Sequence, residues 1–190
     1  TTLFRSDVVI LCVGLDETLE GEEGDTGNSD ASGDKKDLHL PKVQEELIER
    51  VTAVGKPTIL VLMAGSAIDL NYAEENCSGI LLAWYPGARG GKAVADLLFG
   101  KVSPSGKLPV TFYKDLEGMP EFTDYSMKNR TYRYMEGEAL YPFGYGLTYG
   151  AVRVKEVQVL NAVTGESDIE VQVAVENRGG TDTEDVVQIY

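Results

Sequence analysis

Three runs of consecutive apolar residues mark the first hundred positions of the chain. They are DVVILCVG at 7–14, PTILVLMAG at 57–65 and SGILLAWYPG at 78–87. Runs without polar alternation are typical of strands that are buried on both faces, as in a parallel sheet. GKLPVTFY at 106–113 predicts a fourth strand. We therefore expect a largely parallel sheet.

Two segments between and after these runs have the periodicity of helices. In the first, from Pro41 to Gly55, the apolar positions that should face the sheet are Val43, Leu47, Val51 and Val54. Proline suits the first helical position and glycine suits the end. The second lies in GGKAVADLLFG at 90–100, where the helix should end just before Gly100. Strands that alternate with helices predict a layered α/β sandwich.

The pattern changes after residue 114. Residues 115–150 are rich in aromatics and glycine and have no clear period, which favours an ordered connector. Residues 151–190 alternate with period two and predict about three short antiparallel strands, the last in EDVVQIY. We thus divide the chain into an α/β domain at 1–114, a connector at 115–150 and a partial β-domain at 151–190. Because it lacks an initiator Met and stops inside a predicted strand, we expect a fragment of a larger protein.

Charge and composition exclude several classes of function. The chain has 17 basic and 31 acidic residues, a net charge of −14, which disfavours nucleic acid as a partner. No apolar run approaches the roughly 18 residues of a membrane span. Cys12 and Cys77 lie in or beside apolar stretches, so we expect buried free thiols and neither a metal site nor a disulfide. No motif predicts a cofactor.

The long loop at 15–40 is the leading candidate for a functional site. It leaves the carboxyl end of the first predicted strand, where open α/β sheets bind ligands. Loops of more than about 12–15 residues are uncommon in compact domains and are often functional. A carboxylate here can act as a general acid once the site desolvates it. The alternative is that 16–37 is a solvated, flexible insertion, as charge-rich runs often are.

Three other features allow both a structural and a functional interpretation. PGARGG at 86–91 could bind phosphate, although glycines that let a helix pack closely on a sheet explain it better. His39 has no second His or Cys nearby, which favours a structural or surface role over a metal site. Trp84, Tyr85 and the tyrosines of RTYRY could stack on a sugar or fill a domain interface, and the interface is the commoner case.

Several long stretches, in this order, resemble the second domain of glycoside hydrolase family 3. They are GKPTILVLMAGSAIDL, AWYPGARGGKAVADLLFGKVSPSGKLPVTFY and YSMKNRTYRYMEGEALYPFGYGLTY. The ending VAVENRGGTDTEDVVQIY is similar to the start of the fibronectin type III-like domain of many members. GLDETLEGEEGD and YPFGYGLTY look most like the β-xylosidase branch, although β-glucosidases share much of the pattern.

The resemblance implies a retaining, exo-acting hydrolase of β-linked oligosaccharides such as those of xylan. Its nucleophile is an aspartate on an N-terminal (β/α) barrel domain of the same polypeptide, and its general acid/base is a glutamate on the loop after the first strand. Within Glu20-Gly21-Glu22-Glu23 we expect Glu22 to take that role, with Glu23 and then Glu20 as runners-up. Relatives often carry Gly-Asp-Arg further along this loop, whereas this chain has Lys35 in place of the arginine.

Two alternatives to a β-xylosidase stay open from the sequence. One is a β-glucosidase-type member, and the other is a non-catalytic carbohydrate-binding or scaffold module. Because the nucleophile belongs to the barrel domain, we expect the 190-residue chain alone to be inactive.

Overall fold

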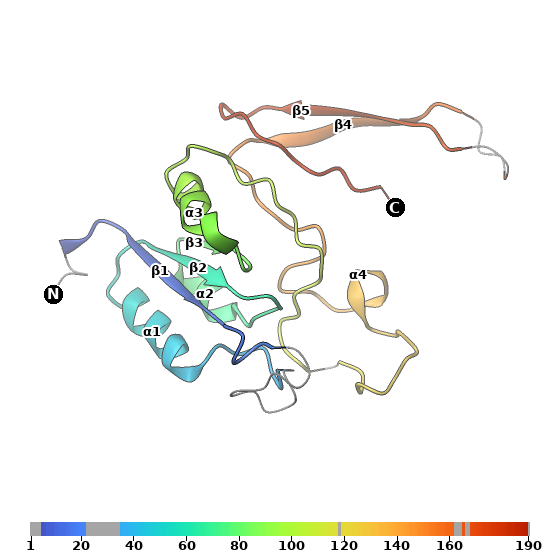
Figure 1. Cartoon of the computed structure of the whole chain (residues 1–190). Coiled ribbons are helices and arrows are strands. Elements are labelled where there is room, and N and C mark those ends of the chain that lie inside the picture. The colour runs from blue at the N-terminus through green and yellow to red at the C-terminus, as the bar shows by residue number, and fades with distance from the viewer. Residues whose placement is uncertain (1–4, 22–34, 118, 162–164, 166–167, 190) are drawn as a thin grey trace. The chain divides into compact units, whose positions relative to one another are not determined.

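The structure is a computed structural model that describes residues 5–21, 35–117, 119–161, 165 and 168–189. The chain forms two compact units (Figure 1). The first comprises residues 1–94 and 109–143, and the second comprises 95–108 and 144–190. The division at 114 and 150 that the sequence suggests stays a prediction.

A three-stranded parallel sheet organises the first unit, which confirms the predicted α/β class. Its strands are β1 (Val9–Gly14), β2 (Thr58–Met63) and β3 (Gly79–Leu82), and they lie in the order β1-β2-β3. β1 pairs with β2 from Val9 opposite Thr58 onward, and β2 pairs with β3 from Ile59 opposite Gly79. The central strand is the most buried, since Leu60 and Leu62 have no exposed surface.

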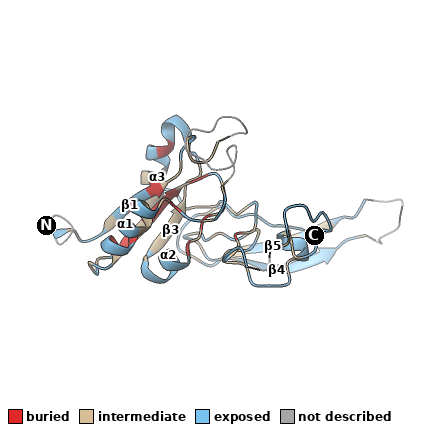
Figure 2. Cartoon of the chain, turned by 90° about the horizontal axis from the view of Figure 1, so that it is seen from below, coloured by how far each residue is buried: buried red, intermediate tan, exposed pale blue. Residues whose placement is uncertain are grey.

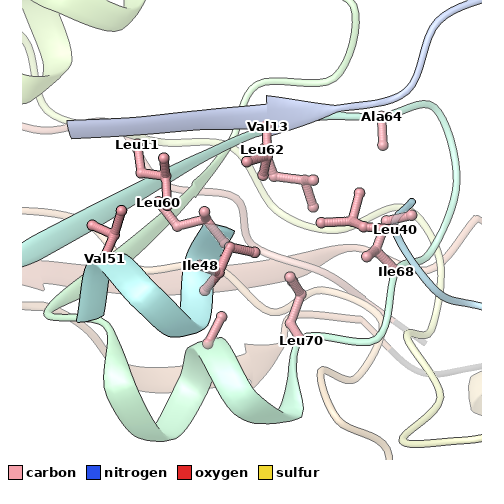
Figure 3. Close-up of a cluster of buried hydrophobic side chains, with 11 residues drawn as sticks. Leu11, Val13, Leu40, Ile48, Val51, Leu60, Leu62, Ala64, Ile68 and Leu70 are labelled. Carbon is pink, nitrogen blue, oxygen red and sulfur yellow. The ribbon is translucent and has the colours of Figure 1, made fainter. Parts of the chain in front are cut away.

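Two helices cover the apolar face of this sheet. They are α1 (Lys42–Thr52) and α2 (Asn71–Asn76), and the sequence did not predict α2. Figure 3 shows leucines of β1 and β2 directed toward Ile48 and Val51 of α1. The core cluster consists of Leu11, Val13, Leu40, Ile48, Val51, Leu60, Leu62, Ala64, Ile68, Leu70 and Ala73.

The buried face of α1 differs from the predicted one. Val51 is buried as expected, but its partner is Ile48, one turn earlier at i−3. Val43 and Leu47 are 73% and 45% exposed, because they lie on the neighbouring stripe of the helix. Pro41 precedes the first helical residue instead of forming it.

β1 is buried on one face only, which corrects the expectation of burial on both faces. Leu11 and Val13 are buried, whereas Ile10 is 47% exposed and Cys12 is exposed. Successive side chains of a strand point to opposite faces, so Ile10 and Cys12 lie on the face opposite to that of Leu11 and Val13. Cys77 is half-buried, and burial raises the pKa of its thiol.

The predicted fourth strand at 106–113 is wrong. Of its residues, Phe112 forms an isolated antiparallel bridge with Tyr141, and the rest belong to no strand. Pro109 has no backbone N–H with which to continue a ladder. The apolar signal of this segment reflects the burial of Phe112, which is 1% exposed and packs edge-on against Tyr141 at 6.3 Å between ring centroids.

Apart from a 3₁₀ turn at Gly87–Arg89, four further elements complete the described chain. They are α3 (Gly90–Leu98), α4 (Thr131–Tyr134) and an antiparallel pair of strands in the second unit, β4 (Val152–Val159) and β5 (Val171–Asn177). Helix α3 and the β4–β5 pair were expected from their periods, and α4 was not. No helix in the described residues is long and apolar enough to cross a membrane.

The strand expected in EDVVQIY is absent from the described residues 178–189. β4 and β5 remain a two-stranded ribbon whose side chains are mostly exposed (Figure 2). Alternation alone is not sufficient for a strand, because a strand also needs a hydrogen-bonding partner.

One ion pair of the second unit gives stability a pH dependence that can be tested. Lys107 Nζ lies 2.9 Å from Asp185 Oδ1, and this hydrogen bond holds the pKa of Asp185 below its usual value. Stability from the pair is therefore present above the pKa of Asp185 in the unfolded chain, about 3.9, and is lost as the pH falls through the lower folded value. We expect Asp185→Asn to cost about 1 kcal/mol at pH ~6 and almost nothing at pH ~2.

Urea unfolding followed by circular dichroism measures this difference at each pH. Asp182→Asn is the matched control, since Asp182 lies three positions away in the same segment and is exposed. A cost for Asp185→Asn that did not change with pH would contradict the role of this pair.

Candidate functional site

The candidate site is built where the three parallel strands end. β1 runs into residues 15–21, β2 into residues 64–70 and β3 into residues 83–89. In a parallel sheet the carboxyl ends meet at one edge, so these three loops come together although they are far apart in the sequence. Polar groups from all three loops contact one another there.

A tight turn after β1 sets the position of Glu20. Asp16 Oδ1 accepts hydrogen bonds from the backbone N–H of Thr18 at 2.9 Å and from its hydroxyl at 2.7 Å. The carbonyl of Asp16 accepts from the N–H groups of Leu19 and Glu20 at 3.0 and 2.9 Å. An aspartate that bonds the backbone two residues on is the usual nucleus of such a turn. The turn brings the chain back over the sheet edge.

Glu20 is bound by the other two loops. Its Oε2 accepts a hydrogen bond of 2.7 Å from the backbone N–H of Gly65, which follows β2. The same oxygen accepts the hydroxyl of Tyr85, which follows β3. Glu20 thereby joins the ends of all three strands through one carboxylate oxygen.

The surroundings of Glu20 favour its charged form. Burial raises the pKa of Glu20, but Ser66, Tyr85, Gly65 and the charge of Lys35 together lower it below the usual value. Glu20 Oε1 and Ser66 Oγ are both buried and lack a well-aligned partner among the described residues.

Tyr85 owes its position to an unusual backbone conformation. The preceding residue, Trp84, has φ of 51° in the left-handed region, which is an outlier for a bulky side chain. Such strain tends to occur at functional sites. Burial together with the hydrogen bond and charge of Glu20 raises the pKa of Tyr85 to about 12. The phenol therefore stays a proton donor to Glu20 at any ordinary pH.

Lys35 contacts the same loop from the other side. Its Nζ donates a hydrogen bond of 2.9 Å to the carbonyl of Ala67, and nearby Leu38 accepts one of 2.7 Å from the N–H of Asp69. Burial lowers the pKa of Lys35, and the charges of Glu20 and Asp37 oppose that shift. Residues 20 and 35 therefore both attach to the segment 65–67.

Gly65 allows the close approach of its neighbours. A Cβ at this position would lie 2.9 Å from a ring carbon of Tyr85 and 3.2 Å from Glu20 Oε2. Any side chain would thus push the phenol and the carboxylate away from the N–H that binds Glu20.

Of the three glutamates predicted as acid/base candidates, the structure describes one. Glu22 and Glu23 lie outside the described residues. Glu20 is described, and its lowered pKa suits a hydrogen-bond acceptor better than a proton donor, which needs a raised pKa. The structure therefore favours an anchoring role for the second runner-up.

The other candidate features take no part in the contacts of Glu20. Gly90 is buried, and a Cβ there would lie 2.4 Å from the Pro86 ring, so this glycine allows close packing within its own turn. His39 Nδ1 lies 3.0 Å from Glu45 Oε1 of α1, on an exposed surface. A polar hollow of about 510 Å³ lies in the connector and is lined by Pro120, Asp124, Lys128, Asn129, Glu136 and Gly137. Among the described residues, no group of three His, Cys, Asp or Glu side chains could hold a metal ion.

Sequence reasoning missed the partners of Glu20 in the second loop. Gly65, Ser66 and Ala67 follow a buried strand, and this position was the one available signal. Gly65 donates its backbone N–H to Glu20, and the carbonyl of Ala67 accepts from Lys35. No residue type reveals such backbone contacts. Tyr85 and Lys35 were noted, but not as neighbours of Glu20.

Comparison with known proteins identifies the relatives of this chain. Residues 2–149 match the glycosyl hydrolase family 3 C-terminal domain. Among curated proteins, a xylan 1,4-beta-xylosidase of Xylanibacter ruminicola is 46% identical over 183 residues, which cover 96% of this chain and 21% of the relative. A periplasmic beta-glucosidase of Salmonella typhimurium is 34% identical, over 98% of this chain and 25% of the relative. The chain thus spans about a fifth to a quarter of these relatives.

Solved structures agree with this relationship. The GH3 beta-glucosidase of Bifidobacterium adolescentis superposes with a TM-score of 0.79 at 31% identity, over 95% of this chain and 27% of that chain. The similarity covers both the parallel sheet and most of the residues that follow it.

Proposed function

Because the chain belongs to the glycosyl hydrolase family 3 C-terminal domain family, we propose that it forms the acid/base half of a retaining exo-β-glycosidase of the β-xylosidase type. The other half, with the nucleophile, is the N-terminal (β/α) barrel domain of the same polypeptide. The substrate is a β-linked oligosaccharide, cleaved from its non-reducing end. No cofactor takes part.

The chemistry needs two carboxyl groups about 5–5.5 Å apart across the scissile bond. The aspartate of the barrel attacks the anomeric carbon while Glu22 donates its proton to the departing glycosidic oxygen. The sugar is then held as a glycosyl ester and the rest of the substrate leaves as an alcohol. Glu22, now a carboxylate, takes a proton from water, whose oxygen displaces the aspartate and restores both groups.

One observation of the structure carries the proposal. Glu20 and Lys35, which flank the segment that contains Glu22 in the sequence, are both anchored at the carboxyl edge of the parallel sheet. This edge is where open α/β sheets present catalytic groups. The β-xylosidase type is favoured over the β-glucosidase type because of the 46% identity to a xylan 1,4-beta-xylosidase.

Exposed aromatic side chains of the connector support docking against another domain. Phe122 and Tyr125 are 87% and 84% exposed, and Tyr132 and Tyr134 are 44% and 49% exposed. Exposed aromatic side chains that gather on one surface are typical of sites where proteins or domains dock. We assign this surface to the barrel domain, and β4 and β5 to the start of a fibronectin type III-like domain.

The decisive experiment compares the chain alone with the polypeptide that also carries its barrel domain. Only the longer protein should hydrolyse nitrophenyl β-xyloside, faster than the matching β-glucoside or α-arabinofuranoside, and NMR of the first product should show retained configuration. Faster cleavage of the β-glucoside would establish a β-glucosidase. Sugar binding by both proteins with hydrolysis by neither would establish a carbohydrate-binding module instead.

A further inference from the structure

The residues on both sides of segment 22–34 are attached to one short loop. Glu20, just before the segment, accepts the N–H of Gly65 at 2.7 Å. Lys35, just after it, donates to the carbonyl of Ala67 at 2.9 Å. The two attachment points are only two residues apart on a loop that follows the most buried strand of the sheet.

We propose that Glu20, Lys35 and Tyr85 form a clamp that positions the general acid/base of this glycosidase without exchanging a proton with the substrate. This inference rests on the proposed function, because the clamp acts through the segment that contains Glu22. The three side chains come from separate parts of the chain and converge on residues 65–67.

The opposite charges of Glu20 and Lys35 strengthen the clamp. The Glu20 carboxylate and the Lys35 ammonium attract each other, and each is partly withdrawn from water. Hydrogen bonds to charged groups are roughly twice as strong as those between neutral groups. Glu20 and Lys35, which flank the segment in the sequence, are thereby fixed relative to the sheet and to each other.

Tyr85 connects the clamp to the third strand of the sheet. Its hydroxyl shares Oε2 of Glu20 with the N–H of Gly65, so the carboxylate is held from β2 and from β3 at once. Gly65 has no side chain to separate them. Since a misplacement of about 1 Å can lower a rate by roughly 10²-fold, an acid/base two residues away is sensitive to this contact.

The test measures kcat/KM of the barrel-containing protein on xylobiose, whose leaving group needs a proton, and on dinitrophenyl β-xyloside, whose leaving group does not. Tyr85→Phe should lower the value for xylobiose about tenfold, and Glu20→Ala by roughly 10²-fold. Glu20→Gln keeps one acceptor oxygen, so its kcat/KM for xylobiose should lie between the values for wild type and Glu20→Ala. All three should cleave the activated xyloside nearly as fast as wild type.

Two controls make the same chemical changes elsewhere in the first unit. Tyr72→Phe removes a hydroxyl that lies 3.1 Å from Thr52 Oγ1, and Glu74→Gln alters a carboxylate that accepts the hydroxyl of Tyr141. Neither should change the ratio of the two substrates. The dependence of kcat/KM for xylobiose on pH adds a second readout. The clamp variants should lower the maximum value, and the pH at which activity falls on the basic side should stay the same.

The outcomes for the clamp and for Glu22 are distinguishable. Equal losses on both substrates, or none, in Tyr85→Phe and Glu20→Ala would overturn the clamp. If Glu22→Gln selectively slowed xylobiose and the clamp variants did not, the proposed function would stand and the clamp would fall. If the clamp variants were selective and Glu22→Gln was not, the clamp would stand and the role would pass to another carboxylate of the segment.

Discussion

Replacement of Glu22 with glutamine should lower kcat/KM for xylobiose by about 10³-fold in the barrel-containing protein, within the range that general acids contribute. Glutamine keeps the size of the side chain but has no proton to donate to the glycosidic oxygen. A dinitrophenolate departs without protonation, so formation of the glycosyl ester from the activated xyloside should be nearly unchanged. The two substrates together separate loss of acid catalysis from a general loss of activity.

Hydrolysis of the ester should become slow in the same variant, because no base is left to activate water. Added azide needs no base and should restore turnover of the activated substrate as a glycosyl azide of retained configuration. Glu23→Gln is the matched control, since it removes one carboxylate from the adjacent position. If Glu23→Gln showed the selective loss and the azide rescue while Glu22→Gln did not, the assignment would move to Glu23.

The parts of the fold that the sequence predicted are those that local pattern determines. β1, β2 and β3 come from apolar runs, and β4 and β5 come from segments that alternate with period two, as side chains on the two faces of a strand do. The errors concern what each element packs against. Nothing in the period of α1 tells Ile48 from Leu47, since both lie beside the same apolar stripe, and only the position of the sheet decides.

The site was predictable in place but not in its contacts. Loop position after β1 and the resemblance selected the segment that contains Glu20 and Glu22. The roles of Gly65 and Ala67 depend on backbone groups, and that of Tyr85 depends on the left-handed conformation of Trp84. Such contacts join residues 45 and 65 positions apart, which no local pattern records.

Replacement of Gly14 with alanine should destabilise the first unit by about 3 kcal/mol, at the upper end of the usual cost of overpacking. A Cβ on Gly14 would lie 1.9 Å from the carbonyl oxygen of Met63, the residue opposite it on β2. That oxygen belongs to the backbone and already accepts the N–H of Leu15 at 2.8 Å, so it has no room to move. The end of β1 must shift instead.

Gln44 makes the shift more costly. Its side-chain amide accepts the N–H of Gly14 and donates to the carbonyl of Gly14, both at 2.8 Å, and so ties α1 to the end of β1. Movement of Gly14 would weaken both bonds. Urea unfolding followed by the fluorescence of Trp84, the single tryptophan of the chain, measures the loss.

Gly79→Ala is the matched control, because Gly79 lies in β3 of the same sheet and a Cβ there would meet nothing within 4 Å. It should be neutral or slightly stabilising, since alanine restricts the unfolded chain more than glycine does. Equal stability of the two variants would contradict the crowding at Gly14. The end of β1 also leads directly into the turn that carries Glu20, so Gly14→Ala should weaken the clamp while the protein is still folded. Selective loss of xylobiose cleavage below the unfolding temperature would then connect the packing of this strand end to the position of the catalytic acid.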